Sequence, residues 1–176
     1  NMKAIWLSQF DLKPIYLKGG KQRPKADFET KITAVLKNVK DLGFNTVFVQ
    51  VRPYADSFYP STLYPASSYV TGEYGVNFSY DPFSIIVAKA HSLNLSVHAW
   101  INPMRGMSSA NLNLVADEYV MTDWVGTRRL YEYSSLNYLN IAYEDVRELI
   151  INGAAEIVRN YDVDGVHMDD YFYFGD

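Results

Sequence analysis

The chain has 176 residues, a formal net charge of −4 and a sequence pI near 5.3, and 48% of its residues are hydrophobic, a composition typical of one globular domain with a substantial core. The acidic balance and the absence of a basic run argue against a nucleic-acid partner, because such binding depends on clustered Lys and Arg. No apolar stretch approaches the roughly 20 residues of a membrane span, and we expect no secretory signal before Met2. The lack of cysteine excludes disulfides and thiolate chemistry.

The first part of the chain predicts a strand, a loop and a helix. We expect a strand over residues 3–10 and a loop over residues 11–25, which are rich in Pro, Gly and Lys. From Asp27 onward apolar residues recur at three and four positions, which indicates an amphipathic helix. Gly43 is expected to end this helix, because glycine readily takes the conformation that closes a helix.

The middle of the chain predicts two further strands around a second helix. The β-branched run Thr46–Val51 indicates a strand that stops at Arg52-Pro53, and a loop is expected over residues 54–81. A helix is expected from about Pro82, because proline is tolerated in the first turn of a helix. The run from Ser96 to Asn102 then indicates a third strand.

The last part of the chain predicts a long connection, a helix and a strand. Residues 104–143 are too many for a plain connection, so we expect a functional loop with a short helix near residues 115–121. Apolar spacing predicts a third long helix over residues 144–161, and the final strand begins at Gly165.

This strand–helix alternation predicts an α/β fold with a parallel sheet and right-handed crossovers. Two architectures remain open at this point, namely a doubly wound sheet and a (β/α) barrel. No Gly-x-Gly-x-x-Gly motif follows the first strand, which weakens the dinucleotide-binding version of the doubly wound fold.

Alternation along the strands separates side chains that face the helices from side chains that face a barrel lumen. The apolar set of each strand suits the helix face, which leaves aromatic and polar residues for the lumen. The expected lumen residues are Trp6, Ser8, Phe48, Gln50, Arg52, His98, Trp100, Asn102, His167, Asp169 and Tyr171. A lumen this polar at strand C-terminal ends indicates a functional site.

The adjacent carboxylates Asp169 and Asp170 cannot both face the lumen of a regular strand. Alternation favours Asp169 as the inward group, although a bulge at the strand end would exchange the two. Asp170 is then expected to hold a loop or to pair with a cation.

Four ordered motifs cover most of the chain, at residues 43–53, 59–61, 97–103 and 162–173. Together they resemble the glycoside-hydrolase-like 10 family. The resemblance implies that residues 1–176 form one domain, the truncated N-terminal half of a TIM-type (β/α)8 barrel with strands 1–4, which binds a saccharide at the strand C-terminal ends. Some family members are envelope lipoproteins that act on peptidoglycan, which implies an extracellular or cell-envelope location.

Glycoside hydrolysis usually requires two carboxyl groups, so we expect Asp169 and Asp170 to be catalytic, with Asp169 as nucleophile or charge-stabilising group. Arg52 is expected to keep that carboxylate ionised. The candidates for substrate binding are Arg52, Tyr54, His98, Trp100, Asn102, Trp124, His167 and Tyr171. Glu73, Glu118 and Glu132 are interpreted as surface charges, so the general acid is expected on a later strand and the fragment alone is expected to be inactive.

Two other functions remain open. One is a metal-dependent hydrolase that uses His98, His167 and the two aspartates, although the sequence has no His-x-x-x-His pair. The other is a non-catalytic glycan-binding module. No cofactor is expected, and the open edges of a half-barrel predict self-association.

Overall fold

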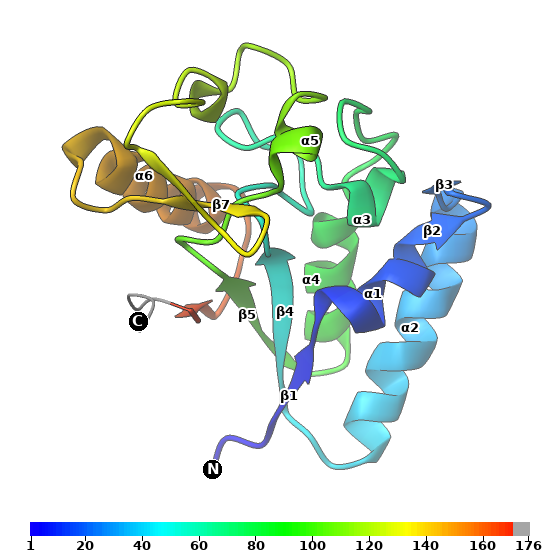
Figure 1. The fold of residues 1–176 in the computed structure, drawn as a ribbon. Helices are drawn as coiled ribbons and strands as arrows, with labels where there is room; N and C mark the ends of the chain where they lie inside the picture. Colours follow the sequence, from blue (N-terminus) through cyan, green and yellow to red (C-terminus); the bar gives the residue numbers. More distant parts are fainter. Residues whose placement is uncertain (171–176) are drawn as a thin grey trace.

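A computed structural model describes residues 1–170, and its centre is a four-stranded parallel sheet (Figure 1). The strands lie in the order β1 (Ala4–Leu7), β4 (Thr46–Arg52), β5 (Ser96–Ile101) and β8 (Gly165–Met168). Strands that are consecutive in the predicted alternation are therefore neighbours in the sheet. The predicted α/β fold with a parallel sheet is confirmed.

Three long helices connect the strands, as the apolar spacing predicts. They are α2 (Lys25–Asp41), α4 (Pro82–Ser92) and α6 (Glu144–Asn160). Gly43 follows α2 with a φ of 85°, a left-handed conformation that glycine adopts without strain. The side chain of Asp81 caps α4 by accepting hydrogen bonds from the backbone N–H groups of Phe83 and Ser84.

The main core lies between the sheet and these helices. Strands β1, β4 and β5 present apolar side chains to the helices, as Val47, Val49 and Val51 do on β4, and all three are fully buried. Other members of this core are Phe28, Ile32 and Leu36 of α2, Phe83 and Ile86 of α4, Val97, Ala99 and Ile101 of β5, and Ile157 of α6. The opposite face of the sheet is thereby left for the candidate site.

The segment after β1 differs from the predicted strand end and loop, because it contains the helix α1 (Gln9–Tyr16). Ser8 and Asp11 form a capping box at its start, in which each side chain accepts a hydrogen bond from the other's backbone N–H. This local cap favours a helix despite Pro14 in its interior. A short antiparallel pair, β2 (Leu17–Lys18) with β3 (Lys21–Gln22), then leads to α2.

The long connections gather beyond the strand C-terminal ends (Figure 1). Their short elements are α3 (Ser68–Thr71), α5 (Ser109–Leu112), the 3-10 helix η1 (Val120–Thr122) and the antiparallel hairpin β6 (Leu130–Tyr133) with β7 (Leu136–Leu139). The prediction of a helix near residues 115–121 is therefore wrong, because α5 ends before residue 115 and η1 overlaps only the last residues of this range. These connections have a second apolar core around Trp124, Leu139 and Leu149.

Among the described residues, no helix combines the length and the apolar character that crossing a membrane requires.

Candidate functional site

An aromatic layer covers the face of the sheet opposite the long helices. The ring of Trp6 lies 4.7 Å from that of Phe48, 4.9 Å from that of Trp100 and 4.6 Å from that of His167, measured between centroids. The His98 ring lies 5.1 Å from that of Phe48. The shared face that alternation predicts for these residues is confirmed, and the Nε1 group of Trp100 is buried there without a hydrogen-bond partner among the described residues.

Above this layer, a chain of hydrogen bonds crosses the C-terminal ends of the strands. The backbone N–H of Gln9 donates to Oε1 of Gln50 at 2.6 Å, and Nε2 of Gln50 donates to Oδ1 of Asn102 at 2.6 Å. Nδ2 of Asn102 then donates to Oδ2 of Asp170 at 2.9 Å. Because Gln50 and Asn102 are buried, these amides have fixed orientations and each points its donor group toward the next residue.

Arg105 holds the same carboxylate from another side. Its Nη1 lies 3.1 Å from Oδ2 of Asp170, and its Nε donates to the carbonyl oxygen of Pro53 at 2.8 Å. Its guanidinium carbon lies 4.9 Å from the centroid of the Tyr54 ring, whose hydroxyl accepts a hydrogen bond from Nε2 of Gln9 at 2.9 Å. Asp170 thus pairs with a cation, one of the two roles expected for it, but it does so within the site rather than turned away from it.

The two adjacent aspartates differ in their contacts. Asp170 has a φ of 57°, which is uncommon for a residue other than glycine. Asp169 donates its backbone N–H to the carbonyl oxygen of Ile101 at 3.1 Å, and its Oδ1 accepts from the backbone N–H of Asp170 at 2.9 Å. The long-range side-chain contacts at the site thus belong to Asp170, whereas Asp169 fixes the backbone beside it.

The predicted lumen position of Arg52 is wrong. The pairing of β4 with β5 shifts between Gln50 and Arg52, so Val51 is an extra residue that reverses the alternation at the strand end. Arg52 is 1% exposed, its guanidinium carbon lies 3.7 Å from the centroid of Tyr64, and Nη2 donates to the hydroxyl of Tyr59. Arg52 therefore belongs to the helix side of the sheet and does not pair with Asp169.

The family follows from a comparison with known proteins. A family model described as "Glycosyl hydrolase-like 10" matches residues 1–176. The chain belongs to this family. Two curated relatives are the glycosyl hydrolase YngK of Bacillus subtilis, 39% identical over 143 residues, and the glycosyl hydrolase DigH of Escherichia coli K12, 33% identical over 190 residues. These matches cover 79% and 98% of this chain but 27% and 42% of the relatives, so the chain spans less than half of their length.

Solved structures show the same architecture. The PgaB (BpsB) glycoside hydrolase domain of Bordetella bronchiseptica matches with a TM-score of 0.63 and 13% identity, over 97% of this chain and 44% of that one. The maltogenic α-amylase AmyB of Thermotoga neapolitana matches with a TM-score of 0.55 and 16% identity, over 89% of this chain and 38% of that one. At these identities the likeness concerns the fold alone. The glycosyl hydrolase-like 10 chain is thus a parallel (β/α) half-barrel, equivalent to the first four strands of a TIM-type barrel.

Another predicted site residue of this glycosyl hydrolase-like 10 chain, Trp124, lies away from the network. Trp124 is 5% exposed and packs in the second core, so its ring is not available to a sugar and its predicted stacking role is wrong. The reason is that the long connection needs an apolar core of its own. Tyr171 lies outside the described residues.

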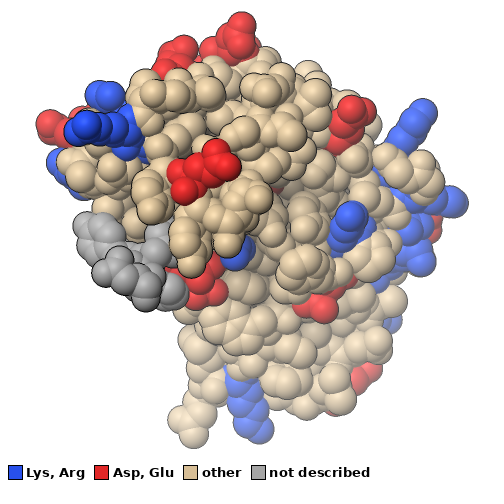
Figure 2. All heavy atoms as spheres, viewed as in Figure 1, with Lys and Arg blue, Asp and Glu red and all other residues tan. Residues whose placement is uncertain are grey.

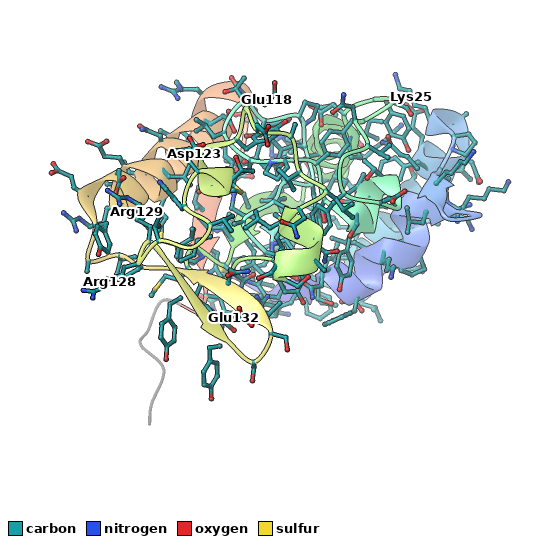
Figure 3. The ribbon with its side chains drawn as sticks, turned by 45° about the horizontal axis from the view of Figure 1, so that its top comes forward. Lys25, Glu118, Asp123, Arg128, Arg129 and Glu132 are labelled. Atoms are coloured by element: carbon teal, nitrogen blue, oxygen red, sulfur yellow. The ribbon has the colours of Figure 1, made fainter. Side chains whose placement is uncertain are left out.

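The glutamates interpreted as surface charges are exposed. Glu73, Glu118 and Glu132 all have solvent-exposed side chains, and Figure 3 shows Glu132 on the β6–β7 hairpin and Glu118 at the periphery. Figure 2 shows acidic groups spread over the displayed face and basic groups gathered mainly at two of its edges. Among residues 1–170, no group of three or more His, Cys, Asp or Glu side chains is arranged to hold a metal ion.

Three site residues were not predicted from the sequence, namely Gln9, Arg105 and Tyr138. Gln9 and Arg105 lie just beyond the ends of β1 and β5, where strand alternation no longer says which way a side chain points. Tyr138 of β7 forms a β-bridge with Arg105. The pKa of its hydroxyl is raised, chiefly by burial. The nearby Arg105 cation opposes this rise, and the Asp170 charge adds to it. The hairpin therefore borders the site. Their signal in the sequence is position: Gln9 lies at the end of the first predicted strand, Arg105 lies shortly after the third, and Tyr138 lies within an unusually long connection.

Proposed function

We propose that this chain supplies part of the active site of a glycoside hydrolase, with Asp170 as the carboxylate that acts at the scissile bond. The observation that carries the proposal is the asymmetry of this group. Oδ2 is held by Asn102 and Arg105, whereas Oδ1 has no hydrogen-bond partner among the described residues. A carboxylate fixed through one oxygen can present the other to a substrate in a constant orientation.

Asp169 is the second candidate for a catalytic role, and its contact with the backbone of Asp170 favours a positioning role. The substrate contacts in this proposal come from Tyr54, which borders the carboxylate, and from His98, Trp100 and His167, which form the floor below it. Asn102 orients Asp170 and thereby acts on the substrate indirectly.

A hydrolase of this type needs a second carboxyl group about 5 to 9.5 Å from the first, depending on the stereochemical outcome. We propose that this group lies outside residues 1–170 and that residues 1–176 alone do not turn over. Two facts support this. The chain spans less than half of its curated relatives, and Glu73, Glu118 and Glu132 are all exposed.

As the substrate we propose a bacterial cell-wall or related polysaccharide, and this substrate would place the protein outside the cytoplasm or in the cell envelope. We also propose that residues 1–176 self-associate. The two outer strands of the described sheet, β1 and β8, each pair with only one other strand among residues 1–170, which leaves backbone groups available for pairing.

The test compares Asp170→Asn with Asp169→Asn in the longest native reading frame that contains this chain, assayed by reducing-sugar release from purified bacterial glycan strands. Asp170→Asn is expected to lower kcat by about 10²–10⁴-fold, the range of a lost acid–base or nucleophilic group, and Asp169→Asn by about tenfold or less. The parent form of residues 1–176 is assayed alongside and is expected to release no sugar.

Equal residual activity in the two variants would contradict the assignment to Asp170. Thermal unfolding of both variants controls for loss of the fold. If the long protein binds glycan and leaves every linkage intact after prolonged incubation, a non-catalytic glycan-binding module replaces the hydrolase.

A further inference from the structure

A cavity of about 220 Å³ opens beside the Asp170 site, between the loops that follow β4 and β5 and the β6–β7 hairpin. Its lining includes Tyr54, Ser68, Tyr69, Ser108, Asn111 and Leu136. The volume is below the 300–1,000 Å³ typical of pockets for drug-sized ligands. The cavity therefore suits a single ring rather than a whole oligosaccharide.

Aromatic rings form one wall of this cavity. The rings of Tyr54 and Tyr69 are stacked, with centroids 6.1 Å apart and an interplanar angle of 29°. Beyond Tyr69, the ring of Phe10 lies 6.2 Å away and is 68% exposed. A tyrosine ring combines a flat apolar face with a polar edge, which matches the C–H face and the hydroxyl edge of a sugar ring.

The rest of the lining is uncharged and includes the apolar side chains of Met107 and Leu136, while the ammonium of Lys13 lies 5.2 Å from the centroid of the Tyr69 ring. Ser68, Ser108 and Asn111 contribute hydroxyl and amide groups, and none of the described lining residues is acidic or basic. Hydroxyl and amide groups can each donate and accept hydrogen bonds, as sugar hydroxyls require. An uncharged sugar thus finds both a stacking surface and hydrogen-bond partners here.

One side chain, Arg105, lies between the wall of the cavity and the carboxylate. The guanidinium of Arg105 contacts Oδ2 of Asp170 at 3.1 Å and lies 4.9 Å from the centroid of Tyr54, which is itself part of the cavity wall. A saccharide with one unit at Asp170 can therefore extend its next units past Tyr54 toward Tyr69.

We propose that this cavity is a subsite for one uncharged pyranose unit of the saccharide, with Tyr69 as its stacking platform. The inference rests on the proposed function for its orientation, because the reacting unit is taken to lie at Asp170. Tyr69, Asn111 and Leu136 then determine how much the protein gains from a longer substrate.

The test measures binding rather than cleavage, so that the subsite and the hydrolase activity can fail separately. Isothermal titration calorimetry with chito-, cello- and malto-oligosaccharides of two to six units is carried out on the longest native reading frame that contains this chain. For at least one series, affinity is expected to rise about tenfold when one unit is added, the gain expected from one aromatic stacking contact. Tyr69→Ala is expected to abolish this step, the roughly tenfold rise in affinity on addition of one unit, and Tyr69→Phe is expected to retain it.

Two further variants protect the test against misfolding. Leu136→Trp fills the cavity from the hairpin and is expected to abolish the same step without touching the Tyr69 wall. Tyr119→Ala is the matched control, because Tyr119 is also partly exposed but lines a different cavity of about 210 Å³ with Pro60 and Phe78.

An affinity step that survives both Tyr69→Ala and Leu136→Trp would overturn the subsite, as would the absence of a length-dependent step in all three series. A step that depends on Tyr69 in a protein that cleaves none of these saccharides or glycan strands would support the subsite and contradict the hydrolase.

Discussion

At the scale of single residues, the site depends on side chains whose contacts allow one arrangement. The amide of Gln50 accepts from Gln9 and donates to Asn102, and the amide of Asn102 accepts from Gln50 and donates to Asp170. Each of these buried groups would lose a partner if one amide turned over, and an unsatisfied buried polar group costs about 1–3 kcal/mol. The position of the Asp170 carboxylate therefore depends on a chain of hydrogen bonds that begins at Gln9, the first residue of α1.

A second aspartate is held at the opposite end of the sheet and gives a prediction about pH. Oδ2 of Asp164 accepts from the backbone N–H of Val97 at 2.7 Å and lies 3.0 Å from Nε2 of His91. The Val97 hydrogen bond, and then His91, lower the pKa of this carboxyl below 3.8. Because the pKa is lower in the folded protein, the stabilisation is present above about pH 4 and is lost as the pH falls through the folded-state pKa.

Asp164→Asn is accordingly expected to lower the free energy of unfolding at pH 7 by about 1 kcal/mol, a modest value because the side chain is 42% exposed. The difference from the parent protein should shrink below pH 4. Urea unfolding of both proteins between pH 7 and pH 3 measures it. A difference that stays constant over this range would show that the carboxylate charge is not the cause.

At the scale of elements, the bulge in β4 links the sheet to α6. By turning Arg52 toward the helices, the bulge places a buried guanidinium against Tyr64 and close to Gly153 in the interior of α6. A Cβ at Gly153 would lie 2.6 Å from Cε2 of Tyr64 and 3.0 Å from Nη1 of Arg52. The glycine is thus required by packing, although glycine is unfavourable inside a helix.

Gly153→Ala is expected to destabilise the protein by about 1–2 kcal/mol, because overpacking of this buried contact outweighs the gain in helix propensity of about 1 kcal/mol. Asn152→Ala is the matched control, since Asn152 is the exposed neighbour in the same helix and gains propensity without a clash. Thermal unfolding should show a lower Tm for the first variant and an equal or higher Tm for the second. A rise in Tm for Gly153→Ala would mean that Tyr64 and Arg52 can move aside.

The bulge in β4 also marks the point at which the sequence pattern stops predicting the site correctly. The strands, the long helices and the shared face of His98, Trp100 and His167 were predicted because a repeated pattern carries them. Arg52 was misplaced because one extra residue reverses the alternation, and no residue type in that run marks the bulge.

The remaining elements were missed for local reasons. The helix α1 was hidden by Pro14 and by the loop-like composition around it, while its capping box carried the opposite signal. The β6–β7 hairpin turns at Ser134 and Ser135, whose φ angles of 49° and 67° are usual for Asn or Gly in such turns. The Asp170 contacts depend on a left-handed residue after the strand, which no periodicity can predict.

At the scale of the whole molecule, the half-barrel leaves apolar surface at both edges of its sheet. Trp6 on β1 is 45% exposed and Met168 on β8 is 47% exposed. The outer side of α6 also presents Ile151 and Val158, which are 65% and 60% exposed. Apolar groups beside unpaired strand edges favour association with another chain.

Residues 1–176 are therefore expected to form dimers whose population rises with concentration, measured by sedimentation velocity. Met168→Lys should weaken the dimer by about tenfold, because it removes a partly buried apolar contact of about 1.5 kcal/mol and adds a charge that opposes edge pairing. Val120→Lys is the matched control, since Val120 is 39% exposed but lies in η1, away from the sheet edges. A parent protein that stays monomeric at high concentration contradicts the proposal, and equal weakening by both substitutions would place the contact away from the strand edges.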